Sequence, residues 1–178
     1  EQVESPDLDA ETLAYVATRA TSGAQRMQSL IDDLLSYARV GGQMGRGEVD
    51  LEAVVSDVRA DLAVALEGAE VTVGPLPTVT GDEVQLRAVL QNLVANSAKF
   101  AAPGERARIE VRGTTTADGW RLEVVDHGLG VPEADRGRVF LPLARAHEAV
   151  EGHGIGLATV RRIVDAHHGR IGIDETPG

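Results

Sequence analysis

The chain has 178 residues, of which 43% are hydrophobic and 3% aromatic, and its formal net charge is −11 at pH 7. This length suits one domain with an appendage, and the acidic charge argues against a nucleic-acid partner. Because the sequence has no cysteine, disulfides and thiolate metal sites are excluded. No apolar run approaches the roughly 20 residues of a membrane span and no signal peptide is visible at Glu1, so we expect a cytoplasmic segment without membrane contact.

A long helix is predicted at the N-terminal end, with Asp9 as its N-cap. Apolar residues then recur at alternating steps of four and three, forming what we call the heptad seam: Leu13, Ala17, Ala20, Ala24, Met27, Ile31, Leu34 and Ala38. A 3.5-residue repeat indicates helix-on-helix packing, and one helix of about 30 residues is not stable alone. We therefore expect a partner helix, and the alternative is packing on the chain's own globular domain.

A glycine-rich linker at residues 41–47 divides a stem of residues 1–40 from a domain of residues 48–178. After the linker, the pattern predicts a short strand at 48–50, a helix from Leu51 to Leu66, and strands at 70–73 and 78–80. Asp82 and Gln85 have the spacing of a capping box that begins the next helix.

That helix carries the polar residues Asn92, Asn96 and Lys99 on one face. Amide oxygens are hard donors for a divalent ion, and an ammonium group can reach phosphate oxygens. The face therefore suits magnesium and a polyphosphate. The alternative is the solvated face of an amphipathic helix.

Two glycine clusters accompany this helix. Asp126 ends a predicted strand and can accept a hydrogen bond from an exocyclic amine, while Gly128 and Gly130 allow backbone to approach a flat ring. The second cluster, at residues 152–157, opens an apolar-periodic helix, where backbone amides form an anion site. It matches neither the G-x-G-x-x-G fingerprint nor the Walker loop, so a different nucleotide fold is needed.

The remaining segments follow in order. A hairpin is predicted from residues 106–112 and 120–125 around 114–119, and residues 129–151 have the poor periodicity of a nucleotide lid. A helix at 157–168 and a strand at 170–174 complete the chain.

Four motifs resemble, in order, the N, G1, F and G2 boxes of sensor histidine kinases, members of the Bergerat-fold ATPases: Asn92-Leu93-x-x-Asn96-Ser97-x-Lys99-Phe100, Asp126-x-Gly128-x-Gly130, Phe140-x-Pro142 and Gly152-x-Gly154-x-Gly156-Leu157. Residues 24–40 are similar to the second helix of the dimerisation domain in the phytochrome-like branch. The resemblance implies an α+β fold, a two-layer α/β sandwich with a mixed sheet, preceded by one long stem helix.

The resemblance also implies the ligands and their residues. Asn92, Lys99 and Arg145 would be catalytic, and Asn96 would hold Mg²⁺. ATP or ADP would be bound by Asn92, Asn96, Lys99, Phe100, Asp126, Gly128, Gly130, Gly152, His153, Gly154, Ile155, Gly156 and Leu157. Two departures from the family pattern, His127 and Leu143, are expected to be tolerated.

The implied reaction is transfer of the ATP γ-phosphoryl group to a histidine, for relay to the receiver domain of a response regulator. None of the five histidines has the setting of the family's acceptor, so we expect the acceptor upstream of Glu1 and a homodimer through the stem helix. Two alternatives stay open. One is an ATPase or protein serine kinase of the same fold, and the other is a non-catalytic nucleotide-binding or dimerisation module.

Overall fold

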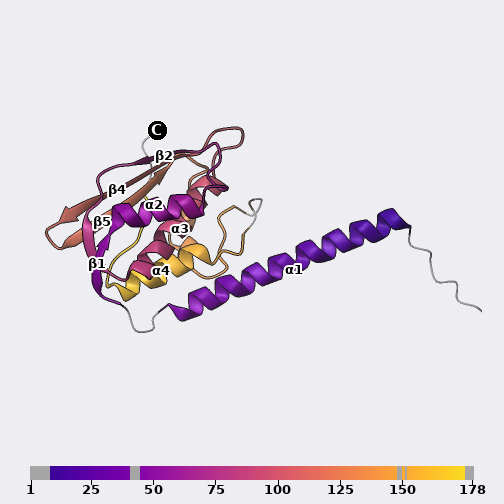
Figure 1. Cartoon of the computed structure of the whole chain (residues 1–178), viewed down its shortest axis with the longest axis horizontal. Helices are drawn as coiled ribbons and strands as arrows, with labels where there is room; N and C mark the ends of the chain where they lie inside the picture. Colours follow the sequence, from indigo (N-terminus) through magenta and orange to yellow (C-terminus); the bar gives the residue numbers. More distant parts are fainter. Residues whose placement is uncertain (1–8, 41–44, 148–149, 151, 175–178) are drawn as a thin grey trace, which may run out of the picture.

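One helix, α1 (Ala10–Arg39), extends away from a layered body of helices and strands (Figure 1). This computed structural model describes residues 9–40, 45–147, 150 and 152–174. Asp9 caps α1 as predicted, since its carboxylate accepts from the Thr12 N–H at 2.6 Å. That hydrogen bond from the Thr12 backbone lowers the pKa of the Asp9 carboxyl. Of the predicted linker, residues 41–44 lie outside the described residues.

The strands form two sheets. β1 (Gly47–Asp50) pairs antiparallel with β3 (Thr78–Gly81), while β2 (Glu70–Val73) runs parallel to β4 (Arg108–Thr116), which is antiparallel to β5 (Gly119–Asp126). The three-stranded sheet, in the order β2-β4-β5, confirms the predicted mixed sheet. The β4–β5 hairpin is longer than predicted, because pairing continues to Thr116 and Gly119 and leaves only residues 117 and 118 at the tip.

Three helices make the second layer: α2 (Leu51–Asp61), α3 (Glu83–Lys99) and α4 (Gly156–Ala166). α2 and α3 cover the strands through a sheet-side cluster: Val49, Leu51, Val54, Val55, Val58, Val79, Leu86, Leu90, Val94, Ile109 and Val111. The other side of α3 meets α4 and the end of the stem in a smaller α4-side cluster: Val40, Val89, Val160 and Ile163. Both clusters are aliphatic, and α3 lies between them and contributes residues to each. No helix in the described ranges combines the length and apolar content that a bilayer crossing requires.

The helix predicted from Leu51 to Leu66 is too long. α2 ends at Asp61, and successive turns follow, in which the Ala63 N–H donates to the Ala60 carbonyl at 3.3 Å. Leu62 and Leu66 nevertheless pack against the sheet-side cluster. The apolar period therefore continues after the regular helix has stopped, which is why the pattern overestimated its length.

The predicted capping box is only half formed. Asp82 Oδ1 accepts from the Gln85 N–H at 3.0 Å, but the Asp82 N–H donates to His167 Nε2 at 3.2 Å instead of to the Gln85 side chain. His167 Nδ1 lies 2.9 Å from the Ile163 carbonyl, so this nitrogen carries the proton and Nε2 is the acceptor. His167 thus ties the end of α4 to the start of α3. Asp82 Oδ2 also accepts from the Gly45 N–H at 2.8 Å, which anchors the chain as it enters the domain.

The strand predicted at residues 170–174 is wrong, because these residues are irregular and pair with no strand in the described part of the chain. Ile171 is held by side-chain packing against the α4-side cluster rather than by a backbone ladder. The preceding helix ends at Ala166 rather than at His168. His168 has a φ of 59°, and the Gly169 N–H closes the helix end on the Val164 carbonyl at 2.8 Å.

Candidate functional site

The polar face of α3 meets the N-terminus of α4. Asn92 donates through Nδ2 to the Ala88 carbonyl at 2.8 Å, which fixes the orientation of its amide. A Cβ placed on Gly156 would lie 2.6 Å from Asn92 Oδ1 and 3.9 Å from Asn96 Nδ2. The amides of Asn92 and Asn96 therefore face the first residue of α4, and only glycine at position 156 leaves them in place.

Lys99 lies one turn further along the same face. A Cβ on Gly152 would be 2.6 Å from Lys99 Nζ, so the ammonium group sits directly against the turn that precedes α4. Gly152 and Gly154 have φ values of 147° and 68°, which side-chain-bearing residues rarely adopt. The structure thus brings Asn92, Asn96 and Lys99 together with residues 152–157, as the sequence predicted.

The start of α4 offers backbone donors to an anion. Among the residues that the structure describes, no side chain caps this helix, and its N-cap residue Ile155 is buried. Backbone N–H groups of a first helical turn have no intrahelical acceptor, and the helix dipole adds positive potential there. With Lys99 beside the turn, this region is suited to phosphate oxygens.

Asp126 stands at the end of β5 with its carboxylate held on both oxygens. Oδ1 accepts from the Gly128 N–H at 3.0 Å, and Oδ2 accepts from Ser97 Oγ at 3.1 Å. Ser97 is buried on α3, and sequence reasoning gave it no role although it directly follows Asn96. A carboxylate has about four acceptor positions, so Asp126 keeps capacity for a ligand amine after these two bonds.

Gly128 has a structural role that the sequence did not reveal. A Cβ at this position would collide with the carbonyl oxygen of Phe100, which itself accepts from the Leu129 N–H at 2.9 Å. Ala101 and Gly128 also form an isolated antiparallel bridge. Glycine is needed here so that the chain after β5 can cross the end of α3, in addition to any approach of a flat ring.

The predicted lid folds back on both glycine clusters. His147 Nε2 lies 2.8 Å from the Gly130 carbonyl, and the Leu143 N–H donates to the Gly154 carbonyl at 2.9 Å. Two short 3-10 helices, η1 (Glu133–Asp135) and η2 (Arg138–Phe140), lie within it. Residues 148, 149 and 151 are outside the described residues.

Arg145 is exposed on this lid. Its guanidinium donates to the Val150 carbonyl at 2.6 Å, which is a bond within the lid. The predicted reach of Arg145 to a terminal phosphate stays a prediction.

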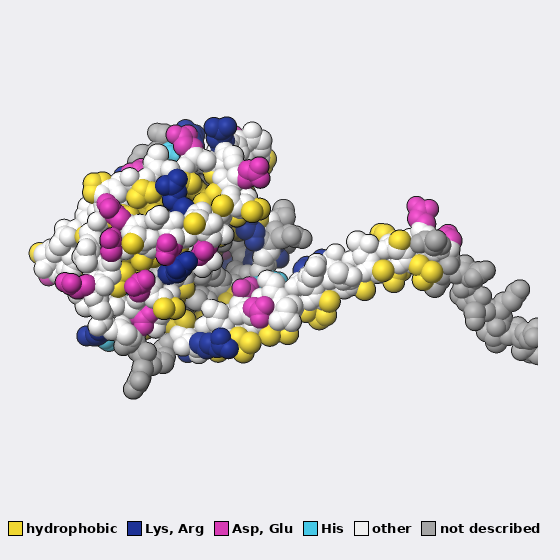
Figure 2. All heavy atoms as spheres, in the orientation of Figure 1, with side chains coloured by type: hydrophobic (Ala, Val, Ile, Leu, Met, Phe, Trp, Pro, Cys, Tyr) yellow, Lys and Arg dark blue, Asp and Glu magenta, His cyan; other side chains and the backbone are white. Residues whose placement is uncertain are grey.

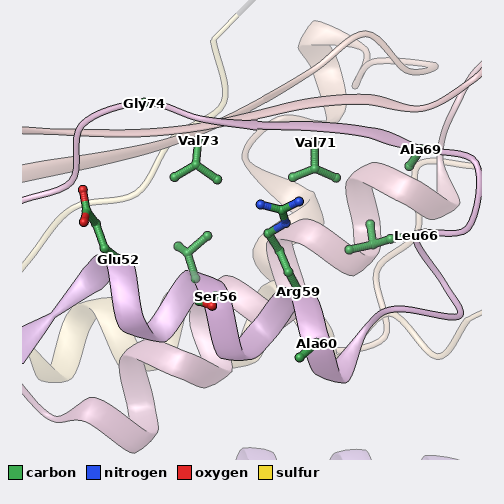
Figure 3. Close-up of a pocket in the computed structure, with 10 residues that line it drawn as sticks. Glu52, Ser56, Arg59, Ala60, Leu66, Ala69, Val71, Val73 and Gly74 are labelled. Carbon is green, nitrogen blue, oxygen red and sulfur yellow. The ribbon is translucent and has the colours of Figure 1, made fainter.

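A groove of about 560 Å³ lies elsewhere, between α2 and β2 (Figure 3). Its lining includes Ser56, Val71 and Val73, with one arginine, Arg59, and one glutamate, Glu52. None of the predicted nucleotide-binding residues lines it. Its one arginine and one glutamate give the groove no net positive charge for a phosphate. The candidate site is therefore the junction of α3 with α4 and the lid.

Comparison with known proteins places this junction within a described family. The family model for the "Histidine kinase-, DNA gyrase B-, and HSP90-like ATPase" matches residues 81–178. The chain is 38% identical over 165 residues to phytochrome-like protein Cph1 of Synechocystis sp., an alignment that covers 89% of this chain and 22% of Cph1. It is 33% identical over 179 residues to the probable sensor histidine kinase TcrY of Mycobacterium tuberculosis, with 96% of this chain and 37% of TcrY covered.

Among solved structures, the crystal structure of full-length ShkA in complex with AMPPNP superposes with a TM-score of 0.75 at 30% identity. The match covers 97% of this chain and 37% of the ShkA chain. The chain thus spans less than two fifths of each of these three proteins.

Proposed function

This chain belongs to the family of histidine kinase-, DNA gyrase B- and HSP90-like ATPases, as an ATP-binding catalytic part of the sensor histidine kinase type, and on this premise we propose its reaction. The domain binds ATP and transfers the γ-phosphoryl group to a histidine of a two-component sensor kinase. The observation that carries the proposal is the meeting of the Asn92, Asn96 and Lys99 face of α3 with the uncapped start of α4.

In this proposal the adenine lies against Asp126, and the phosphates lie against Lys99 and the start of α4. Asp126, held by Ser97 and Gly128, accepts a hydrogen bond from the exocyclic amine of adenine. The amides of residues 154–157 and the Lys99 ammonium bind the phosphates. Phosphoryl transfer depends mainly on positioning and on neutralising developing charge, so a fixed set of donors is what the reaction requires.

Magnesium fits the donors at this site. The Asn92 amide is oriented by its bond to Ala88, so that Oδ1 is presented toward α4, and Asn96 lies one turn away. Within the described ranges no three His, Cys, Asp or Glu side chains converge, so the protein ligands of the ion would be amide oxygens. When bound, magnesium neutralises phosphate charge, and Asn96 with Asn92 would hold it.

The partners follow from the same family. We propose a homodimer through the heptad seam, since Met27, Ile31 and Leu34 are 62, 49 and 43% exposed on α1. Figure 2 shows apolar side chains along one side of this helix. The product phosphohistidine would pass its phosphoryl group to a response regulator receiver domain. A cytoplasmic location is proposed because ATP is supplied there.

Calorimetry with Mg-ADP on the parent chain and two variants tests the proposal. Asp126→Asn should weaken binding about tenfold or more, because an amide presents a donor where adenine also donates. Asp118→Asn, at the exposed tip of the β4–β5 hairpin, makes the same change of charge away from the site and should leave affinity unchanged. Absence of nucleotide binding by the parent, or equal affinities for the two variants, would contradict the proposed site.

The dependence of ATP binding on magnesium separates the non-catalytic alternative from the catalytic ones, namely the histidine kinase and the ATPase or protein serine kinase of the same fold. If magnesium leaves the affinity for ATP unchanged, the chain is better described as a non-catalytic nucleotide-binding module. Strong dependence on magnesium supports the catalytic reading, because Asn92 and Asn96 are then needed to place the ion.

A further inference from the structure

The stem docks on the catalytic body with a face that is not the heptad seam. Four residues of the stem at spacings of three, four and three are partly or fully buried, and we call them the docking stripe: Leu30, Asp33, Tyr37 and Val40. Successive residues of a helix are about 100° apart, so Asp33 points well away from the neighbouring seam residue Leu34. The seam therefore stays exposed while Asp33, Tyr37 and Val40 of the docking stripe contact the body.

Two side-chain contacts hold this face besides the packing of Val40. The Arg162 guanidinium of α4 lies over the Tyr37 ring, 4.8 Å from its centroid. The Asp33 carboxylate lies 2.9 Å from His153 Nδ1. Because an ionised carboxylate only accepts, Nδ1 carries the proton in this pair. Both α4 and the turn before it are thus fastened to the stem.

His153 is placed in the centre of the candidate phosphate site. The residue before it, Gly152, abuts Lys99 Nζ, and the residue after it, Gly154, accepts from the Leu143 N–H of the lid. The side chain of His153 is 23% exposed and that of Asp33 is 47% exposed, so solvent screens the pair only in part. A contact at His153 can therefore affect both the turn at residues 152–155 and the lid that bonds to Gly154.

We propose that the Asp33–His153 hydrogen bond is a latch through which stem docking and nucleotide binding oppose each other. The inference rests on the proposed function, since it concerns the same nucleotide site. Phosphates bound at residues 152–157 would bring negative charge close to the Asp33 carboxylate and compete with it for the His153 N–H. By linkage, the factor by which nucleotide weakens docking equals the factor by which docking weakens nucleotide binding.

Removing the charge of Asp33 is the direct test of the latch. Asp33→Asn in the full chain should raise the affinity for Mg-ADP about two- to fivefold, the range expected when one charge is removed at a partly exposed site. Asp32→Asn is the matched control, because Asp32 is the neighbour on the same helix, is exposed, and its carboxylate accepts a bond along the helix from Gln28 Nε2 at 3.1 Å. This control should leave the affinity unchanged.

The position of the stem relative to the catalytic body can be followed by measuring a distance between two spin labels. The chain has no cysteine, so Gln25→Cys on α1 and Ala117→Cys at the hairpin tip give two spin-label sites, both exposed, and mixing with excess unlabelled chain leaves one labelled protomer in each proposed dimer. Pulsed EPR without nucleotide should give a narrow distance distribution for the labelled parent and for Asp32→Asn. Asp33→Asn, or addition of Mg-ADP to the parent, should broaden it.

The results separate the two proposals. Nucleotide binding with equal affinities for Asp33→Asn and Asp32→Asn, or a distribution that neither Asp33→Asn nor Mg-ADP broadens, overturns the latch alone. Lack of nucleotide binding by every variant overturns the proposed function, and the coupling with it, while the EPR comparison of the two variants still decides whether Asp33 holds the stem.

Discussion

The substitution Gly156→Ala is expected to weaken nucleotide binding while changing the stability of the domain only slightly. Gly156 is the first residue of α4 and has no positive φ, so an alanine backbone is unstrained there. The new Cβ would lie 2.6 Å from Asn92 Oδ1, about 0.8 Å inside ordinary contact at 3.4 Å. The Asn92 amide must move by about that distance, which would pull its Nδ2 away from the Ala88 carbonyl.

The two consequences have different sizes. A misplacement of about 1 Å in a catalytic site costs on the order of a hundredfold in rate, and we expect Mg-ADP affinity to fall roughly tenfold, or about 1.4 kcal/mol. Alanine gains up to about 1 kcal/mol over glycine within a helix, which offsets part of the local clash. The melting temperature should therefore change by no more than about 4 °C.

Calorimetry and thermal unfolding of matched variants measure both quantities. Gly23→Ala is the control, because Gly23 lies within helix α1, outside the candidate site, and the nearest atom to its added Cβ would be Arg26 Nη2 at 4.0 Å. In an Asn92→Ala background the Cβ at position 156 meets no oxygen, so Gly156→Ala should add nothing further. Equal affinities of Gly156→Ala and Gly23→Ala would refute the placement of the ligand between α3 and α4.

Two further expectations concern the stem and the reaction. Ile31→Glu or Leu34→Glu should convert a dimer to a monomer in sedimentation, because an unpaired buried charge costs several kcal/mol, and a monomeric parent at high micromolar concentration would contradict the proposed use of the seam. This chain alone, incubated with γ-labelled ATP, should acquire no acid-labile, base-stable phosphate, since none of its histidines lies on α1. A separate stem fragment that carries an acceptor histidine should restore labelling, but not with Asn96→Ala, and labelling of the chain alone would show that the acceptor was misplaced.

The sequence predicted best what is encoded by short-range spacing. The heptad seam, the Asp9 cap and the common face of Asn92, Asn96 and Lys99 depend on residues a few positions apart, and the structure has all three arrangements. The family resemblance was confirmed as well, because four ordered motifs span most of the domain.

The sequence failed to predict features that depend on residues far apart in the chain. Asp82 and Gln85 have the spacing of a capping box, but His167, 85 residues away, takes the Asp82 N–H. Ile171 and Ile173 alternate as in a strand, yet alternation does not say whether a neighbouring ladder exists. The Asp33–His153 pair links residues 120 positions apart, and no local pattern marks it.

Helix α3 has almost no side that is free of a constraint. Of its 17 residues, only Glu83, Val84, Gln91 and Lys99 are exposed, and Lys99 belongs to the candidate site. The other sides face the strands, α4 and the candidate nucleotide. Substitutions that do not affect function are therefore expected only on a narrow exposed strip of this helix. Val84 and Gln91, seven residues apart, lie on that strip. In a saturation-mutagenesis scan, this strip should be the one place on α3 where most substitutions leave stability and nucleotide binding unchanged.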